Sequence, residues 1–313
     1  MTDSKAKWQP DHAIELVAGT PAGGGQDRPA RALIGVLQAR HLIEQPMNLV
    51  NIPGRGGGNA WDYLAARPRD AHILSITSPT IISNPLLGIS ALAYDSLTPI
   101  ANLYVEPLAF LVRADSPLRD AHDLMSRLRD AAGLLIASAT ALGNSNHVAL
   151  AKVTQHAGGD VTALRIEIFD SARFAIGHVM ERRAELAVVT AASAVPELEA
   201  SALRCIAISA PARLDRLFAG APTLLELGVD CAIGMWRGVI APAGVGAAAI
   251  AFWEEKLAAA TRGAEWQAEL ARQYWTSTYV VGTELAKFLS AERALMTKML
   301  GDLGLCQAKS GVR

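Results

Sequence analysis

The chain has 313 residues, of which 51% are hydrophobic, and its 29 basic and 30 acidic side chains give a net charge of −1. This length corresponds to about two domains of ~100–200 residues, and the apolar content is sufficient for packed cores. The even charge balance argues against a nucleic-acid-binding protein and against a polybasic membrane-surface protein. The cysteines and histidines show no spacing typical of a disulfide framework or a metal site, so we expect no metal and no cofactor.

The first thirteen residues, MTDSKAKWQPDHA, bear on cellular location. They carry positive charges but neither the apolar run nor the cleavage site of an export signal, and no window has the ~18 apolar residues of a membrane span. As written, the chain is expected to stay in the cytoplasm. A leader removed from a longer precursor would instead place it in the periplasm.

Short apolar runs alternate with amphipathic segments along the chain. The runs predict strands, as expected where a parallel sheet is covered on both faces, at residues 14–20, 47–51, 73–77, 109–112, 134–138, 164–169, 186–190, 205–209 and 238–241. Helical patterns occupy residues 27–40, 59–66, 121–129, 147–156, 172–182, 247–261, 264–274 and 283–303. This alternation predicts a doubly wound α/β architecture, in which ligands lie at the carboxyl ends of the strands.

Two polar breaks suggest how the chain is divided. One is the turn at residues 113–117, and the other lies near residues 235–237. If the chain crosses between lobes at both, residues 1–113 and 236–313 form a discontinuous first lobe and residues 114–235 form the second. A ligand would then lie in a cleft between the lobes, where pockets are common.

Residues 21–27, PAGGGQD, stand between the first strand and the first helix. Three glycines leave backbone N–H groups uncovered, and the helix N-terminus adds a partial positive field, so an anion is the expected ligand. The alternative is an ordinary strand-to-helix turn. A second glycine-rich stretch at residues 53–58 lacks the features of a phosphate or dinucleotide loop, and we interpret it as a structural turn.

Six blocks in order carry a resemblance to a known family. They are PAGGGQD (21–27), NIPGRGGGNA (51–60), SPTIISNP (78–85), IASATALGNSNH (136–147), APTLLELG (221–228) and WRGVIAPAGV (236–245). Together they resemble the tripartite tricarboxylate transporter substrate-binding proteins, the Bug or TctC family of extracytoplasmic solute receptors, from about residue 8 to residue 303.

The resemblance implies a two-lobed fold of the type II periplasmic-binding-protein kind. It also implies a monomer that closes on a small carboxylate, such as a dicarboxylate, a tricarboxylate, or an aromatic or amino acid, and delivers it to the membrane subunits of a transporter. The sequence departs from the family at residues 167–172 (EIFDSA) and 181–185 (ERRAE), and its first residues do not predict an export signal. The alternative is therefore a cytosolic derivative that acts as an enzyme on, or a sensor of, a small carboxylate.

Candidate ligand-binding residues follow from the loops and the resemblance together. The first lobe contributes Ala22, Gly23, Gly24, Gly25 and Asp27 from the first loop, with Ser78 and Thr80 after a later strand. The second lobe contributes Ser138, Thr140, Ser145, Asn146, His147 and Asp170. For several of them a turn or a helix cap is the alternative role.

Two pairs of these residues bear on the chemistry. Asp170 would bind a ligand ammonium or hydroxyl, whereas the nearby Arg173 would favour a diacid, and the sequence leaves both open. Ser145 and His147 suggest a hydrolase only superficially, because residues two apart at a helix start do not face each other and no GxSxG motif is present. We therefore expect a binding protein rather than an enzyme.

Overall fold

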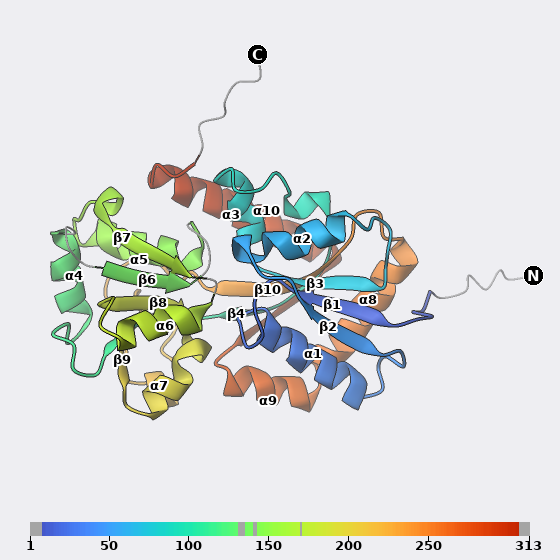
Figure 1. Cartoon of the computed structure of the whole chain (residues 1–313), viewed down its shortest axis with the longest axis horizontal. Coiled ribbons are helices and arrows are strands. Elements are labelled where there is room, and N and C mark those ends of the chain that lie inside the picture. Colours follow the sequence, from blue (N-terminus) through green and yellow to red (C-terminus); the bar gives the residue numbers. More distant parts are fainter. Residues whose placement is uncertain (1–7, 131–134, 140–142, 170, 307–313) are drawn as a thin grey trace, which may run out of the picture.

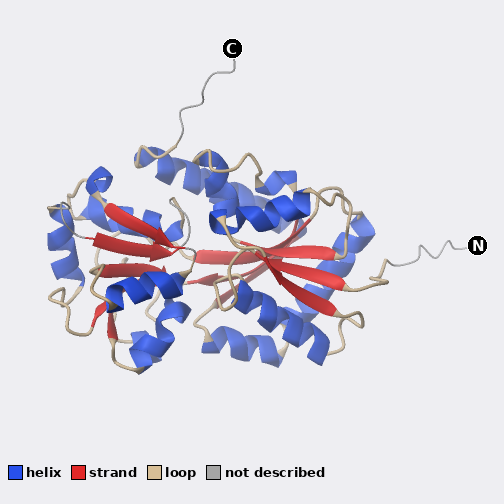
Figure 2. Ribbon diagram, viewed as in Figure 1, coloured by secondary structure: helices blue, strands red, loops and turns tan. Residues whose placement is uncertain are grey.

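Two β-sheets lie side by side in the computed structural model, and helices cover both faces of each (Figures 1 and 2). The structure describes residues 8–130, 135–139, 143–169 and 171–306. We call the first sheet with its helices lobe 1 and the second sheet with its helices lobe 2. The predicted two-lobed α/β fold is confirmed. No helix in the described ranges has both the length and the apolar character that crossing a membrane would require.

The sheet of lobe 1 has six strands in the order β11-β4-β10-β3-β1-β2. The strands β1, β2 and β3 are parallel, whereas β10 runs antiparallel to β3 and β4, and β11 runs antiparallel to β4. Their bounds are β1 (Ile14–Ala18), β2 (Met47–Asn51), β3 (Ile73–Thr77), β4 (Thr98–Glu106), β10 (Met235–Ala241) and β11 (Thr276–Val281).

Helices cover the lobe 1 sheet in two layers, each with its own apolar core (Figure 1). On one face, Trp253 and Trp266 are fully buried in a core with the apolar side of α1, and on the other Trp61 packs with the long C-terminal helix. The helices are α1 (Asp27–Ala39), α2 (Gly58–Ala65), α3 (Thr80–Leu86), α8 (Ala247–Thr261), α9 (Ala264–Arg272) and α10 (Gly282–Asp302).

The sheet of lobe 2 has five strands in the order β7-β6-β8-β5-β9. Its strands are β5 (Leu108–Arg113), β6 (Leu135–Ala139), β7 (Arg165–Phe169), β8 (Leu186–Thr190) and β9 (Leu203–Ser209). The helices α4 (Ala121–Arg129), α5 (Ser145–His156), α6 (Ala172–Met180) and α7 (Val195–Glu199) cover it. The three parallel strands β6, β7 and β8 end toward lobe 1, so their following loops face that lobe (Figure 1).

The chain crosses from the first sheet to the second at Pro107, between β4 and β5. The sequence analysis placed the strand at residues 109–112 in the first lobe, but β5 pairs with β8 and β9 of the second sheet. The polar turn at residues 113–117 therefore marks the end of β5 and not the crossing. The chain returns to the first sheet just before β10, close to the expected break.

Candidate ligand-binding site

Two adjoining cavities lie between the lobes, where the loops that follow the strands face each other. The inner cavity has a volume of about 30 Å³, which is room for roughly two water molecules. The outer cavity has a volume of about 410 Å³. The two share Gly25, Ser171, Ala172 and Ser193, and we call them together the front cleft.

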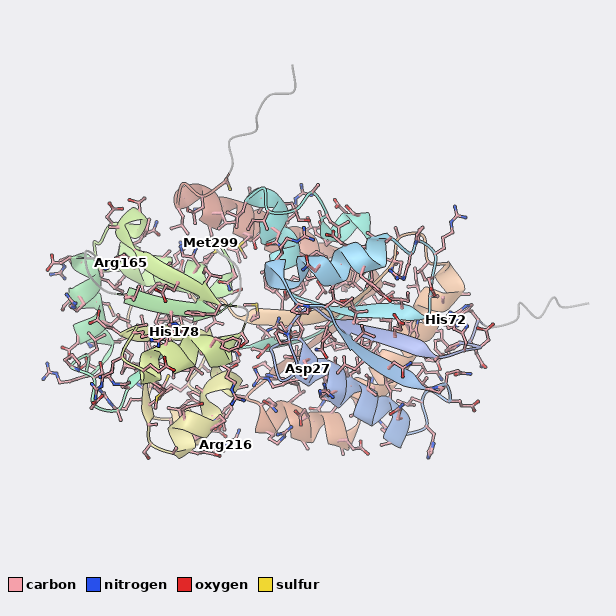
Figure 3. All side chains as sticks on the ribbon, viewed as in Figure 1. Asp27, His72, Arg165, His178, Arg216 and Met299 are labelled. Atoms are coloured by element: carbon pink, nitrogen blue, oxygen red, sulfur yellow. The ribbon has the colours of Figure 1, made fainter. Side chains whose placement is uncertain are left out.

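Hydrogen bonds within the first loop fix its shape at the start of α1. The hydroxyl of Thr20 accepts hydrogen bonds from the backbone N–H groups of Gln26 and Asp27, at 3.2 and 3.3 Å. The Asp27 carboxylate is fully buried and accepts from the N–H of Gly23, from Asn51 and from Arg31. Asp27, labelled in Figure 3, thus fixes the shape of the loop and lines neither cavity, so it was proposed as a ligand-binding residue but acts here within the protein.

The three glycines of this loop have different roles. The N–H of Gly23 donates to Asp27 at 2.8 Å, and the N–H of Gly24 donates to the carbonyl of Pro21 at 2.9 Å, so neither is available to a ligand in this arrangement. Gly25 lines both cavities. A Cβ atom at Gly25 would lie only 2.7 Å from the guanidinium of Arg237. A side chain at this position would therefore displace that guanidinium from its place in the cleft.

Ser78 and Thr80 follow β3 and line the inner cavity. Their hydroxyl oxygens are 2.7 Å apart, and the Thr80 hydroxyl donates to the carbonyl of Gly56 at 2.6 Å. Gly56 also lines the cavity, although the sequence analysis interpreted its loop only as a turn. Ala22 is exposed and lines the outer cavity.

From lobe 2, the N-terminus of α5 faces the front cleft. Asn146 lines the inner cavity and is buried. The N-cap is Asn144, whose side chain accepts from the N–H of His147 at 3.0 Å, so neither Ser145 nor Asn146 has that role. The side chain of Ser145 is fully buried. The N-terminal partial charge of this twelve-residue helix favours an anion in the cleft.

His147 is buried as an uncharged side chain. Its Nδ1 accepts a hydrogen bond from the N–H of Gly143 at 3.0 Å, and burial lowers its pKa to about 4. An imidazole used in this way fixes the turn before α5. It is not arranged as the base of a hydrolase, because a base must accept a proton from its nucleophile.

Three predicted site residues lie wholly or partly outside the described part of the chain. Thr140 and Asp170 lie outside the described residues, and of Ser138 only the backbone, in β6, is described. Their contribution to the site stays a prediction.

A hydrogen bond joins the two lobes across the front cleft. The guanidinium of Arg28, on α1, donates to the hydroxyl of Ser193 at 2.8 Å, and that hydroxyl is 2.9 Å from the hydroxyl of Thr190. Thr190 is the last residue of β8 and Ser193 follows the strand, and both line the inner cavity together with Thr20 of lobe 1. Hydroxyl groups from both lobes therefore meet at one place.

Arg237 is the one charged side chain among the described residues that line the inner cavity. Its side chain is 5% exposed, and its Nε donates to the Glu106 carboxylate at 2.7 Å. The phenol of the adjacent Tyr104 stays neutral, because burial and, to a smaller extent, the charge of Glu106 raise the pKa of Tyr104 well above its usual value. Glu106 holds the guanidinium through Nε, and the terminal nitrogen Nη2 lies beside Gly25 in the cleft.

The sequence analysis did not single out Arg237, Arg28, Thr190 or Ser193. One signal was present for Arg237, since an arginine interrupts the otherwise apolar run of β10, MWRGVIA. A charge within a strand that reads as buried usually has a partner or a function. The residues Thr190 and Ser193 carried no comparable signal.

A group of potential metal ligands lies outside the front cleft. Asp11, His12 and His72 offer atoms within 4.8 Å of one another, and the two imidazole rings stack 3.6 Å apart. His72, labelled in Figure 3, is at the end of lobe 1 farthest from lobe 2. This group takes no part in the site between the lobes.

The family model of the tripartite tricarboxylate transporter family receptors, TctC, matches residues 33–305. The chain belongs to the TctC family. The resemblance inferred from the six sequence blocks is confirmed.

Relatives of this TctC-family chain share its length and fold. A UPF0065 protein encoded in the gbd 5′ region of Cupriavidus necator is 24% identical over 305 residues, which cover 96% of this chain and 90% of that protein. MatC from Rhodopseudomonas palustris, solved with bound malate, is 21% identical to this chain, with a TM-score of 0.79. The match covers 93% of this chain and 99% of the MatC chain. An R. palustris protein solved with adipate is 21% identical to this chain, with a TM-score of 0.81, and the match covers 95% of this chain and 99% of that protein's chain.

Proposed function

We propose that this TctC-family chain is a solute-binding protein that takes up a small carboxylate in the front cleft and delivers it to a tripartite tricarboxylate-type transporter. The observation that supports the ligand class is Arg237. Its guanidinium lies at the inner end of the cleft, is oriented by Glu106, and is surrounded by hydroxyl groups from both lobes. Such a planar donor group matches a carboxylate by bidentate hydrogen bonding.

The outer cavity supports the same ligand class. Its charged side chains among the described residues are Arg28, Arg173 and Glu197, so cations predominate. The inner cavity has room for little more than the carboxylate itself, and the rest of the ligand would extend into the outer cavity. The solved relatives with malate and adipate both hold small dicarboxylic acids.

We further propose that the lobes move relative to each other about Pro107 and the segment before β10. Only these two connections join the sheets in sequence. A ligand that contacts both lobes favours the arrangement in which both sets of contacts are made. The bond between Arg28 and Ser193 joins the two lobes and supports this proposal, because it would be lost if the lobes moved apart.

A thermal-shift panel tests the proposal. The protein is heated with acetate, succinate, malate, adipate, citrate, glutamate or benzoate, and with succinamide as an uncharged control. A ligand that binds only the folded state stabilises it by RT ln(1 + [L]/Kd), about 2.7 kcal/mol at a hundredfold excess over Kd. At least one acid is expected to raise the melting temperature while succinamide does not. If none of the acids does so, the carboxylate assignment is wrong.

A further inference from the structure

A second and larger cavity lies on the other side of the strand pair β4 and β10. It has a volume of about 580 Å³, within the ~300–1,000 Å³ range of small-molecule sites. One wall is the face of α10 that carries Phe288, Leu295 and Met299, and Met299 is labelled in Figure 3 near the boundary of the lobes. We call this space the rear cavity.

The rear cavity is separated from the front cleft by the alternation of side chains along two strands. On β10, Met235 and Arg237 line the inner front cavity, whereas Trp236 between them lines the rear cavity. On β4, Glu106 pairs with Arg237, whereas its neighbour Val105 lines the rear cavity. Because successive side chains of a strand point to opposite faces, the two spaces lie back to back.

The apolar part of the rear cavity is built from large side chains. The rings of Trp236 and Phe288 meet edge to face, with centroids 5.7 Å apart, and Met299 packs in the same core. Leu295 is 43% exposed, one of the few large apolar side chains of the described chain that solvent reaches to this extent. Leu295 therefore adds a solvent-accessible apolar surface to the lining of the cavity.

The charged groups of the rear cavity differ in whether they have partners. Glu292 accepts a hydrogen bond from the indole Nε1 of Trp236 at 2.9 Å, and Lys298 pairs with Asp302 at 2.6 Å. Asp230 is exposed to solvent. Lys152, on α5, lines the cavity and has neither an ion-pair partner nor a hydrogen-bond partner in the ranges that the structure describes. The hydrogen bond from Lys298 and, to a smaller extent, the charge of Lys152 lower the pKa of Asp302. That carboxylate is already paired with Lys298, so the ammonium group of Lys152 is available for a ligand charge.

We infer that the rear cavity is a second ligand-binding site, which takes a small amphipathic anion with a flat apolar body and one acidic group. The body packs on Trp236, Phe288 and Leu295, and the acidic group pairs with Lys152. Lys152 comes from lobe 2 and α10 from lobe 1, so an occupant contacts both lobes. Its binding is then linked to the arrangement of the lobes, independently of which ligand the front cleft takes.

A fluorescence titration with 1-anilinonaphthalene-8-sulfonate tests this site. The probe has an apolar aromatic body and one acidic sulfonate group, and its fluorescence increases when it moves from water into an apolar site. The parent protein is expected to bind one probe molecule. Leu295→Glu replaces an apolar contact by a repelling charge and is expected to weaken binding at least tenfold. Lys152→Ala removes the pairing charge and is expected to weaken it about three- to tenfold.

Two matched variants control for unspecific effects. Leu225 is 42% exposed and does not line the rear cavity, so Leu225→Glu makes the same change outside its lining. Lys287, on α10, pairs with Glu284 and does not line the cavity either, so Lys287→Ala removes the same charge. Both controls are expected to bind the probe within twofold of the parent. If Leu295→Glu binds the probe as tightly as the parent, or if the control variants lose as much affinity as their counterparts, the rear cavity is not the binding site. If Lys152→Ala binds the probe as tightly as the parent, the ligand does not need an acidic group.

Discussion

Trp236 and Arg237 are adjacent in β10, yet their side chains line different cavities on opposite sides of one strand. Trp236 is held by Glu292 of α10, and Arg237 is held by Glu106 of β4. Each side chain is thus fixed by a carboxylate from another element. One strand at the junction of the lobes therefore carries both the proposed carboxylate-binding residue and the wall of the rear cavity.

Replacing Arg237 by methionine is expected to abolish carboxylate binding. The variant loses two or more hydrogen bonds to a charged ligand, each worth ~1.5–3 kcal/mol, so the affinity should fall by at least a hundredfold in calorimetry. It also leaves Glu106 buried and unpaired, which should lower the free energy of unfolding by about 3–5 kcal/mol.

A double variant separates these two effects. Arg237→Met with Glu106→Leu removes both charges, and replacing a buried ion pair by apolar side chains is often neutral for stability. Urea unfolding is expected to show recovery of most of the lost stability, while calorimetry still shows no binding. Restored binding in the double variant would show that Arg237 does not contact the ligand.

Gly25→Ala is expected to weaken ligand binding about tenfold with little loss of stability. The added Cβ would lie 2.7 Å from the terminal guanidinium nitrogen of Arg237 and would push it away from its position in the cleft. The backbone of Gly25 does not have the positive φ that would strain alanine. Gly35→Ala, on an exposed and open face of α1, is the control and should leave affinity unchanged. Equal affinity in both variants would contradict the placement of Arg237.

Much of the fold could be predicted from sequence because local pattern determines it. Short apolar runs located nine strands, and the spacing of Ala30, Leu33 and Leu37 located α1. Two strands were missed. The strand β4 contains the polar Asn102, and register shifts interrupt its pairing with β10. The strand β11 lies at the edge of the sheet, and all its residues are at least partly exposed. Neither sequence is therefore a short, continuous apolar run of the kind that predicted the other strands.

The site was predictable only in part, because its decisive contacts join distant segments. The loop residues near the cleft follow strand ends, and a general rule for α/β sheets places ligands there. The orientation of Arg237 depends on Glu106, 131 residues earlier in the chain, and Arg28 bonds to Ser193, 165 residues later. The N–H groups of Gly23 and Gly24 donate to Asp27 and to the carbonyl of Pro21, and these hydrogen bonds form only in the folded loop. No local pattern contains this information.

The stability of the protein is expected to decrease between pH 6.5 and about pH 4 because of His147. Its pKa is lowered from 6.5 to about 4 by burial, so the unfolded chain binds this proton at a higher pH than the folded chain does. The neutral, buried His147 therefore contributes at most about 3 kcal/mol to the free energy of unfolding. This contribution is fully present above pH 6.5 and is lost as the pH falls toward 4.

The variant His147→Asn isolates that contribution, because the asparagine oxygen can accept from the N–H of Gly143 but does not titrate. Urea unfolding of both proteins at several pH values gives the difference in unfolding free energy. That difference is expected to change between pH 6.5 and 4 and to be constant above pH 7. A constant difference over the whole range would mean that His147 is not buried as a neutral group.

Closure of the lobes is expected to make the protein more compact when the ligand binds. The hydrogen bond from Arg28 to Ser193 joins the two lobes in this structure, so Arg28→Ala should favour a more open arrangement and weaken binding about five- to tenfold, or ~1–1.4 kcal/mol. Small-angle X-ray scattering with and without the best acid of the panel measures the radius of gyration. The control is Arg40→Ala, since Arg40 bonds to Ala259 within lobe 1. An unchanged radius at saturating ligand would indicate a fixed pocket, and equal affinity of Arg28→Ala and the parent would show that this bond does not contribute to closure.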